Sequence, residues 1–581
     1  MKQTLTAFFI VAIAALVTAP GQLSAQSGTL NVYAKGPTLD KVFRGDTLSN
    51  GAQAHSVYQL VSRDTTYIFD ATITIKSSVT ILGVPDPTTG RLPCIQPDVL
   101  SDNSIPGLLF TFNGKGTRVT IKNLYLLGIA INNVVNYGGG QAVQISADSI
   151  RLAVDNVVFE QWSQFAIGYS ANWDKFFITN CKFRNMTTQP NQWYVGEVLR
   201  NENYIGAFKT DTTILKYNTM LCVSGYATAA TGGIVSYYEF SHNNVVFTFK
   251  NLFFLDRMVN AKFNNNIFYG VYSGGQNKTE YNGGWDSFTA GTVASIITMG
   301  PLDSTTAALL LGTASTGAAD PAAEALRKIE VKNNAYFWPV ALTSYWQAWN
   351  DTSHVDSIYT PVFMNAQSTN MFTNKTSWPN LVQSGNQNVD PGFGASINGV
   401  LNAGTANANG VGLLNWFKAV RTGTGTTETY GYNFTKVTSA GNWTPPWPLP
   451  ETVDMRYTNT TVKNSSTDGL ALGDPYWFTG TPTGVERISS AVPGKFELSQ
   501  AYPNPFNPGT NLKYTLNKSG VVSLKVYNLL GQVVATLVNN ENQSAGTYTV
   551  RVEMYRLTSG LYFAALEQGD NRAVQKLMLL K

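Results

Sequence analysis

The sequence is poor in charge. Asp, Glu, Lys and Arg make up 13% of its 581 residues, against about a quarter in most soluble domains. Neutral polar residues must therefore supply most of the surface. The formal net charge is only +4, and Lys and Arg form no dense run, which argues against a nucleic-acid-binding protein.

Cysteine, histidine and long apolar runs are also scarce. The three cysteines are too few and too scattered for a disulfide framework or a zinc site, so we expect buried thiols with at most one bridge: Cys94, Cys181 and Cys222. The histidines lack metal-ligand spacing: His55, His242 and His354. Beyond residue 25 no stretch approaches the ~20 apolar residues that span a bilayer, so we predict no transmembrane segment.

The N-terminus has the pattern of a secretory signal peptide. Lys2 precedes an apolar run over residues 7–17, and Ser24 and Ala25 supply a small-residue exit. We predict a signal peptide over residues 1–25 and export of the remaining chain; a buried first strand or helix is the alternative. Since 43% of the residues are hydrophobic, the exported chain can form a sizeable core, and its length suggests several domains.

The body of the chain repeats short β-branched and aromatic runs that end at asparagine. The repeated asparagines have a minimum spacing of 22–26 residues, with occasional longer gaps: Asn123, Asn156, Asn180, Asn218, Asn244, Asn266 and Asn334. A minimum spacing with insertions is typical of a solenoid, in which each coil has a fixed length. The runs have the length of strands and little helical periodicity.

A parallel β-helix gives these asparagines a role. Successive coils stack about 4.8 Å apart, so a side chain at a repeated corner lies on its equivalent in the next coil. Asparagine tolerates the left-handed backbone of a tight corner, and its amide can bond the copies above and below. Asn-rich turns of a β-sandwich are the alternative.

The body resembles the right-handed parallel β-helix proteins of the pectate-lyase-like superfamily. Residues 72–83 look like a first coil of that group, and residues 388–393 and 468–477 are similar to segments that close such proteins. The resemblance covers roughly residues 45–480, and we assign residues 26–480 to this β-helix body. Two Gly/Thr-rich stretches, 289–325 and 394–427, read as long insertions or covering loops.

The composition changes after residue 480. Alternating strands separated by Gly and Asn turns predict a small β-sandwich over residues 496–581, after a linker at 481–495. This segment resembles the type A C-terminal sorting domain of the type IX secretion system, in the motifs Tyr502-Pro-Asn-Pro-Phe506, Leu529-Leu-Gly-Gln-Val533, Gly560-Leu-Tyr562 and Lys576 to Lys581. The resemblance implies an immunoglobulin-like fold, export across the outer membrane, and release or attachment at the surface. An ordinary adhesion domain is the alternative.

Chemistry on a β-helix needs a specific set of side chains. Uronate lyases need a cation to neutralise the substrate carboxylate and a base to remove the neighbouring proton. Polygalacturonase-like hydrolases need clustered carboxylates, and no Asp cluster occurs along these coils, which disfavours a hydrolase. No cofactor is evident, and calcium bound through loop carbonyl groups is left open.

One lyase-like set remains in the sequence. Counting nine residues back from the corner asparagines places Lys209, Val235 and Arg257 on one sheet line, and Tyr237 falls on a neighbouring line with Asp211. Lys209 or Tyr237 would be the base, and Arg257 would bind the carboxylate. A solvated face with a Lys–Asp pair is the alternative. His242 reads as a turn residue rather than a catalyst.

Loop aromatics offer a non-catalytic route to sugars. Flat rings can stack on pyranose faces or cover the solenoid core, and both readings are open for the following residues: Trp162, Trp173, Trp193, Trp285, Trp338, Tyr345, Trp346 and Trp349. We therefore predict an exported or surface-attached protein that acts on extracellular polysaccharide, with a lyase of acidic glycans as the enzyme class to test. The alternative is a non-catalytic glycan-binding, adhesive or structural surface protein.

Overall fold

A computed structural model describes most of the chain beyond the predicted signal peptide. It describes residues 28–580 apart from gaps at 63–64, 87–89, 133–138, 187–195, 203–207, 231–232, 256, 274–294, 353–357, 359, 400, 402–412, 415–453, 467, 469, 480–484, 490–492, 507–508, 544 and 555–556. The signal peptide at 1–25 and most of the stretch 394–427 lie outside the described residues.

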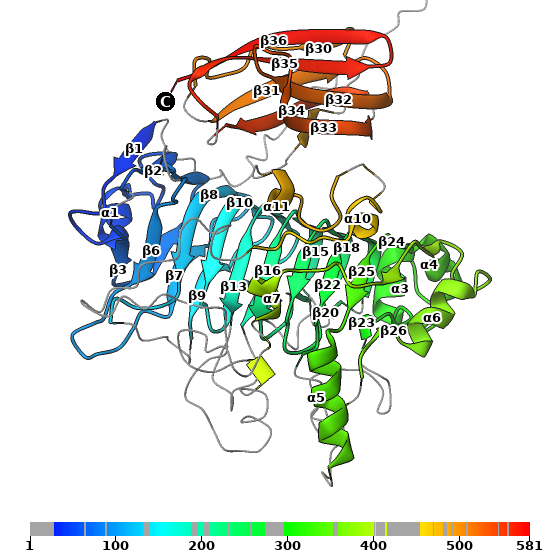
Figure 1. The fold of residues 1–581 in the computed structure, drawn as a ribbon. Coiled ribbons are helices and arrows are strands. Elements are labelled where there is room, and N and C mark those ends of the chain that lie inside the picture. Colours follow the sequence, from blue (N-terminus) through cyan, green and yellow to red (C-terminus); the bar gives the residue numbers. More distant parts are fainter. Residues whose placement is uncertain are drawn as a thin grey trace, which may run out of the picture.

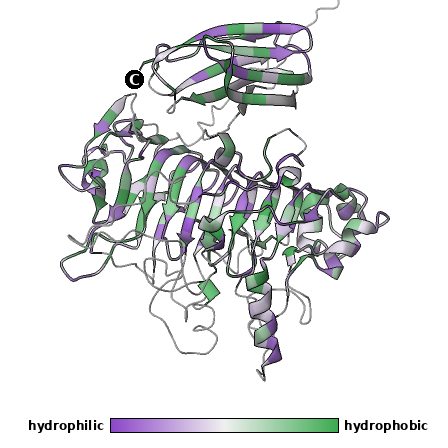
Figure 2. Ribbon diagram, viewed as in Figure 1, coloured by the Kyte–Doolittle hydropathy of each residue, from purple (hydrophilic) through white to green (hydrophobic). Residues whose placement is uncertain are grey.

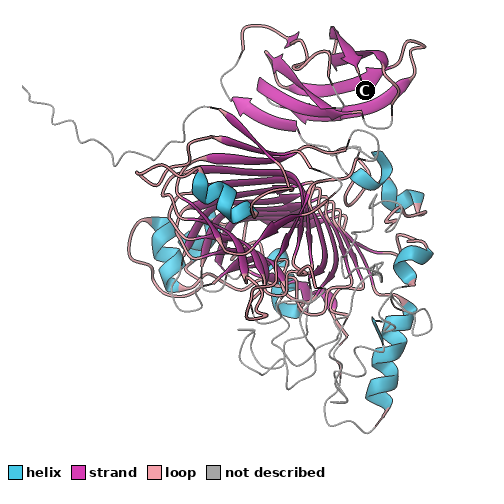
Figure 3. Cartoon of the chain, turned by 90° about the vertical axis from the view of Figure 1, so that its left-hand side faces the viewer, coloured by secondary structure: helices cyan, strands magenta, loops and turns pink. Residues whose placement is uncertain are grey.

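Three ladders of parallel strands wind around one core (Figures 1 and 3). The first ladder contains, in spatial order, β1 (Thr29–Val32), β2 (Val57–Leu60), β5 (Val79–Gly83), β8 (Arg118–Leu127), β10 (Arg151–Glu160), β12 (Asp174–Thr179), β15 (Lys209–Lys216), β18 (Ile234–Ser241), β21 (Arg257–Asn264), β24 (Lys328–Lys332) and β27 (Leu381–Ser384).

The second ladder contains β3 (Tyr67–Phe69), β6 (Cys94–Pro97), the second halves of β8 and β10, β13 (Lys182–Met186), β16 (Thr219–Val223), β19 (Asn244–Val246), β22 (Ile267–Tyr269), β25 (Ala335–Phe337) and β28 (Gln387–Asn388). The third contains β4 (Ile73–Ile75), β7 (Leu108–Phe112), β9 (Gln141–Ile145), β11 (Phe165–Tyr169), β14 (Glu197–Asn201), β17 (Thr228–Ala229) and β20 (Phe253–Phe254). These ladders confirm an all-β solenoid in its coarse form; its handedness and its superfamily stay predictions.

The core is built from side chains stacked in register from coil to coil. Apolar and polar residues alternate along the strands (Figure 2), so one set of side chains points inward. A single row of the first ladder shows this, because its members pair directly and are at most 1% exposed: Ile121, Val154, Ile178, Leu215, Phe240, Phe263 and Val331. Burying each such side chain contributes roughly 1.5–3 kcal/mol, so the repeated row stabilises every coil.

The corner between the first two ladders holds two sets of residues at adjacent positions. Residues in the left-handed conformation include Asn123, Asn156, Asn180, Asn265 and Asn333, with φ between 52° and 59°. The next position carries a buried asparagine ladder. Each side-chain amide nitrogen donates to the side-chain Oδ1 of the next asparagine at 2.8–3.1 Å, in the order Asn218, Asn243, Asn266, Asn334 and Asn386. Asn218, Asn266 and Asn334 of the predicted set belong to this ladder, with Asn243 in place of Asn244. The predicted Asn123, Asn156 and Asn180 occupy the left-handed position instead.

Helices close both ends of the core. At the N-terminal end, Leu39 and Phe43 of α1 (Leu39–Gly45) pack into the core, and Phe43 stacks on Tyr58. At the other end, Met371 and Phe372 of α6 (Ala366–Thr373) enter the core beside β27. Solenoids need such terminal caps because the last coil has no neighbour to cover it. The stretch 289–325 contributes β23 (Ser295–Ile297), α3 (Ser304–Leu311) and α4 (Pro321–Leu326), of which β23 pairs with β26 (Val362–Met364).

The outer face of the second ladder is covered by a second hydrophobic cluster. The covering elements are α5 (Val340–Asp351), α7 (Ala395–Asn398), α10 (Thr460–Lys463) and α11 (Tyr476–Thr479). In Figure 1, α7, α10 and α11 lie over the body, whereas α5 projects below it. Val246 and Ile267 of the ladder belong to one hydrophobic cluster with Trp346, Phe393 and Trp477 of the covering segments. We call residues 466, 468 and 470–479 the strap, because they cross this face just before the chain leaves the body.

The tail forms two four-stranded antiparallel sheets around a separate core. One sheet has the order β29 (Val485–Ser489), β34 (Gly546–Glu553), β31 (Gly509–Leu516) and β30 (Glu497–Leu498). The other has the order β33 (Val533–Gln543), β32 (Gly520–Tyr527), β35 (Gly560–Gln568) and β36 (Asn571–Leu579). Strand β29 lies in the predicted linker 481–495 and pairs with β34, so the sandwich begins earlier than residue 496.

Candidate functional site

The structure brings Lys209 and Arg257 into one row of the first ladder. Lys209 pairs with Ile234, and Ile234 pairs with Arg257, so the two cations lie two strands, about 10 Å, apart. The residue between them is Ile234 rather than the expected Val235, because Asn243 and not Asn244 marks that coil. Tyr237 lies opposite Thr212, not opposite Asp211, so the second predicted line is wrong by one residue.

Each of the three predicted catalytic side chains already has a partner within the protein. The Lys209 ammonium lies 5.3 Å from the ring centre of Trp173, and Arg257 Nε lies 2.5 Å from Asp303 Oδ2. The Tyr237 hydroxyl donates to Glu239 at 2.9 Å. Burial and the neighbouring Glu239 carboxylate raise the pKa of Tyr237, whereas a general base needs a pKa near the working pH.

Most of the loop aromatics cover the solenoid. Trp162 and Trp346 are 1% exposed, and the Trp338 indole donates to the Val271 carbonyl at 2.8 Å. Tyr345 and Trp349 are partly buried against the second cluster. Trp173 is 44% exposed and stays available for a ligand, while Trp193 and Trp285 lie outside the described residues.

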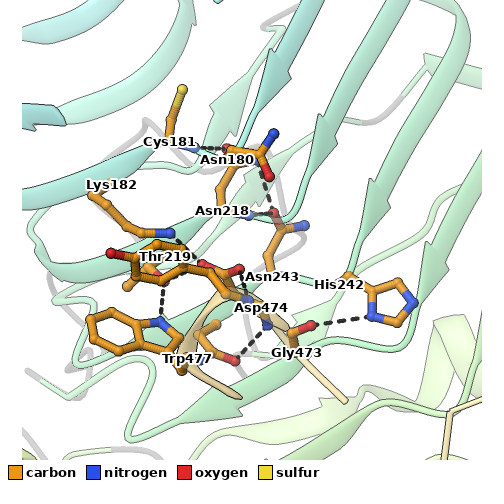
Figure 4. Close-up of polar contacts among 12 residues, drawn as sticks. Asn180, Cys181, Lys182, Asn218, Thr219, His242, Asn243, Gly473, Asp474 and Trp477 are labelled. Atoms are coloured by element: carbon orange, nitrogen blue, oxygen red, sulfur yellow. Dashed lines mark hydrogen bonds and ion pairs between the residues drawn. The ribbon is translucent and has the colours of Figure 1, made fainter. Parts of the chain in front are cut away.

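His242 holds the strap as well as turning the chain. It adopts the left-handed conformation, with φ 53°. Its Nε2 lies 2.7 Å from Asp468 Oδ2. Its Nδ1 lies 3.1 Å from the Gly473 carbonyl oxygen, a contact drawn in Figure 4. The Asn265 side-chain amide nitrogen also lies 3.1 Å from His242 Nε2, so the ring joins the corner to the strap. The three cysteines are buried and form no disulfide, and burial raises the pKa of Cys94 to about 12.

The third ladder carries several buried polar side chains, among them Gln144, Glu197 and Arg200. Its strands are joined to the neighbouring ladders by long segments: 128–140, 187–196 and 202–208. Insertions beside a sheet face are where solenoids place binding surfaces. Gln144 and Arg200 of this face flank Gly168 in register, and they alternate with core residues, so they point away from the core.

Arg200 and Glu197 form the charged part of this cluster. Glu197 is 0% exposed and Arg200 5% exposed, and the Arg200 Nη1 lies 2.9 Å from both Glu197 carboxylate oxygens. The guanidinium also lies 5.7 Å from the ring centre of Tyr226, over which Lys250 Nζ lies at 4.2 Å. Burying an ion pair costs desolvation free energy. Core packing therefore does not explain why the chain keeps Glu197 and Arg200 here.

Two buried oxygens converge above Gly168. A side-chain carbon added to Gly168 would lie 2.6 Å from Gln144 Oε1 and 2.6 Å from Glu202 Oε1, so the two oxygens are no more than about 5.2 Å apart. Neither of these two oxygen atoms has a hydrogen-bond partner among the described residues, although the Gln144 and Gln141 amides interact with the Glu202 carboxylate. The Gln144 amide nitrogen donates to the Ile145 carbonyl at 3.3 Å, which fixes the amide so that its oxygen faces Glu202. We call Gln144, Gly168 and Glu202 the acceptor site.

Burial raises the pKa of Glu202 above its usual range, against the opposing effects of the Gln144 and Gln141 amides and the Arg200 charge. A buried acceptor without a donor costs about 1–3 kcal/mol. The acceptor site is therefore complementary to a ligand that brings hydroxyl or other donor groups. Among the described residues, no group of three or more His, Cys, Asp and Glu side chains is arranged to hold a metal ion.

Sequence reasoning missed the acceptor site. The search for lysine and arginine at regular spacing led to the first ladder, whereas the third ladder depends on glutamine, glycine and glutamate. One signal was present: residues 197–202 contain three charged side chains in six positions, between two insertions, in a chain with few charges.

Comparison with known proteins identifies the tail. Residues 500–580 match the family described as secretion system C-terminal sorting domain. The tail is a type IX sorting domain. The chain is therefore exported by the type IX secretion system and resides at the outer-membrane surface or in the medium. No helix of the described residues is both long and apolar enough to cross a membrane. No curated protein matches the chain.

Proposed function

We propose that this exported protein binds an extracellular polysaccharide at the acceptor site of the third ladder. The observation that carries the proposal is the pair of buried oxygens, Gln144 Oε1 and Glu202 Oε1, that converge above Gly168 without a donor. Sugars present many hydroxyl donors, which can satisfy both oxygens at once. Glycine at position 168 allows both oxygens to lie close to its backbone, because any side chain there would clash with them.

A lyase of acidic glycans is the second candidate. It is supported by the common row of Lys209 and Arg257 and by a second cation row in the same ladder, where Arg118, Arg151 and Lys175 pair in register. In this reading Arg257 binds the substrate carboxylate and Lys209 or Tyr237 removes the proton. Substrate would first have to displace Asp303 from Arg257 and Glu239 from Tyr237.

The test uses residues 26–581 and a panel of neutral and uronate-containing polysaccharides, with and without calcium. Binding is measured by affinity electrophoresis, and cleavage by the ultraviolet absorbance of unsaturated ends. Gly168→Ala should lower affinity at least about tenfold, because its methyl group meets both oxygens. The matched control is Gly394→Ala, since a side-chain carbon there meets nothing within 4 Å.

The outcomes separate the two candidates. Binding that is lost in Gly168→Ala and kept in Gly394→Ala supports the acceptor site. An absorbance rise that disappears in Lys209→Ala or Arg257→Ala establishes the lyase instead. Folded protein that binds no member of the panel contradicts both and leaves an adhesive or structural surface protein.

A further inference from the structure

We propose that the type IX secretion machinery binds the sorting domain through an apolar turn formed by Leu529 and Leu530, together with Tyr502 at the same end of the sandwich. This inference concerns export and is independent of the proposed glycan function. It assigns a contact surface within a domain whose sorting role is established by its family match.

The sequence motifs of the sorting domain divide into buried and exposed residues. Phe506, Tyr562 and Leu577 are at most 6% exposed and belong to the sandwich core. In contrast, Leu530 is 82% and Tyr502 81% exposed, the two highest values among the large apolar residues that the structure describes. Buried motif residues are explained by folding. The exposed ones contribute little to the core, and large exposed apolar groups usually mark interaction sites.

The turn that presents the leucines is held in one conformation. Asn528 Oδ1 accepts from the backbone N–H groups of Leu530 at 3.0 Å and Gln532 at 2.9 Å. The Asn528 side-chain amide donates to Gln532 Oε1 at 2.9 Å, and Gly531 has φ 75°, a conformation that suits glycine. Binding through a preformed turn avoids the entropic cost of ordering it.

The strand register places the motifs at one end of the sandwich. Tyr527, which precedes the turn, pairs with Phe563 and Val533, and Gly560 pairs with Leu579. Phe506 forms a bridge with Leu579, which brings the segment that follows Tyr502 alongside the end of β36. This is the end that carries the C-terminus, labelled C in Figure 1. Four motifs that are far apart in sequence thus lie at one end of the sandwich, where Leu529, Leu530 and Tyr502 are their exposed members.

A protein partner fits this surface better than a glycan does. Leucine side chains offer no hydrogen-bonding groups to sugar hydroxyls, whereas aromatic and aliphatic residues form the cores of protein interfaces. The proposed partner is the type IX secretion machinery, which would bind the two leucines and Tyr502 through an apolar surface of its own. A second copy of this chain is an alternative occupant that the test must separate.

The experiment expresses the full chain in a bacterium that has the type IX system. Cargo is measured in the medium and on the cell surface, against cargo in the periplasm. For the doubly substituted Leu529→Ser, Leu530→Ser protein, the amount found outside the cell should fall at least about tenfold, and the protein should accumulate in the periplasm. A loss of this size is expected when central interface residues are removed. The matched control is Val521→Ser, Val574→Ser, which changes valines that are 55% and 49% exposed elsewhere on the same sheet.

Equal export of the double leucine variant and the wild type would overturn the proposal. Purified proteins are compared by melting temperature, and if the double variant is destabilised, the single Leu530→Ser decides, because Leu530 is the more exposed. Sedimentation of the wild type at increasing concentration tests the second-copy alternative. Self-association that disappears in the leucine variant, with export unchanged, would also overturn the proposal.

Discussion

Lys182 Nζ lies 2.5 Å from Asp474 Oδ2, although 292 positions separate the two residues. Their side chains are 6% and 0% exposed. Asp474 Oδ2 also accepts from the Thr219 hydroxyl at 2.7 Å, and the Trp477 indole donates to the same hydroxyl at 2.8 Å (Figure 4). The strap is therefore fastened to three consecutive coils of the second ladder, through β13, β16 and Asn244 of β19.

Breaking this ion pair should destabilise the body. Asp474→Ala leaves Lys182 buried without its partner, which costs about 3–5 kcal/mol for a buried pair. The melting transition of the body, followed in the full chain, should shift clearly to lower temperature. Arg456→Ala is the control, because Arg456 pairs with Asp454 at the surface and is 66% exposed; it should leave the transition unchanged. Equal shifts in both variants would show that the strap is not fastened here.

The asparagine ladder should tolerate no apolar replacement. Asn266 donates to Asn334 Oδ1 at 2.9 Å and to the Phe240 carbonyl at 2.8 Å, and it accepts from the Asn243 backbone at 2.9 Å. Asn266→Leu removes these bonds at a site that is 0% exposed, so we expect a loss of at least about 2 kcal/mol in the free energy of unfolding. Denaturant unfolding measures it. Asn370→Ala, at an exposed position in α6, should change little; a similar loss there would contradict the assignment.

Glu202→Gln should stabilise the protein and weaken glycan binding. The new amide can donate to Gln144 Oε1, which satisfies the oxygen without a ligand. Because burial raises the pKa of Glu202, ionised Glu202 costs stability. That cost grows as the pH rises from the unfolded-state pKa toward the higher folded-state pKa. The melting-temperature difference between variant and wild type should therefore widen above about pH 4.3. A variant that binds glycan as tightly as the wild type would remove Glu202 from the site.

The strap should loosen at acidic pH. Burial acts to raise the pKa of Asp468, but its bonds to His242, Ser466 and the Leu470 N–H outweigh burial and hold that pKa well below its usual range. A carboxylate with a depressed pKa stabilises the fold above its unfolded value, near 3.9, and this contribution fades as the pH falls further. Asp468→Asn should thus melt lower than the wild type at neutral pH, and the two melting curves should converge below about pH 4. If the melting-temperature difference between variant and wild type stays the same at low pH, the depressed pKa of Asp468 is not its cause.

Sequence periodicity predicted the architecture because each coil repeats the same local sequence pattern. A strand-length apolar run followed by a corner residue occurs in every coil, so the sequence alone indicates the solenoid, the asparagine ladder and the row that joins Lys209 to Arg257. The single-residue error at Asn243 and Asn244 arose because two adjacent asparagines satisfy the same pattern. Only the backbone conformation, left-handed at His242, shows which of them follows the corner.

The sequence by itself determined the parts that depend on local pattern and on motif order: the stacked coils, the export route and the sorting tail. The tertiary structure decided the parts that depend on contacts between distant segments. It joined Asp474 to Lys182, engaged Arg257 with Asp303, and brought Glu202 to Gln144 above Gly168. Such contacts depend on how insertions fold back over the coils, and their lengths follow no repeat. A repeated pattern can therefore predict the ladders, but not the side chains that meet across their outer faces.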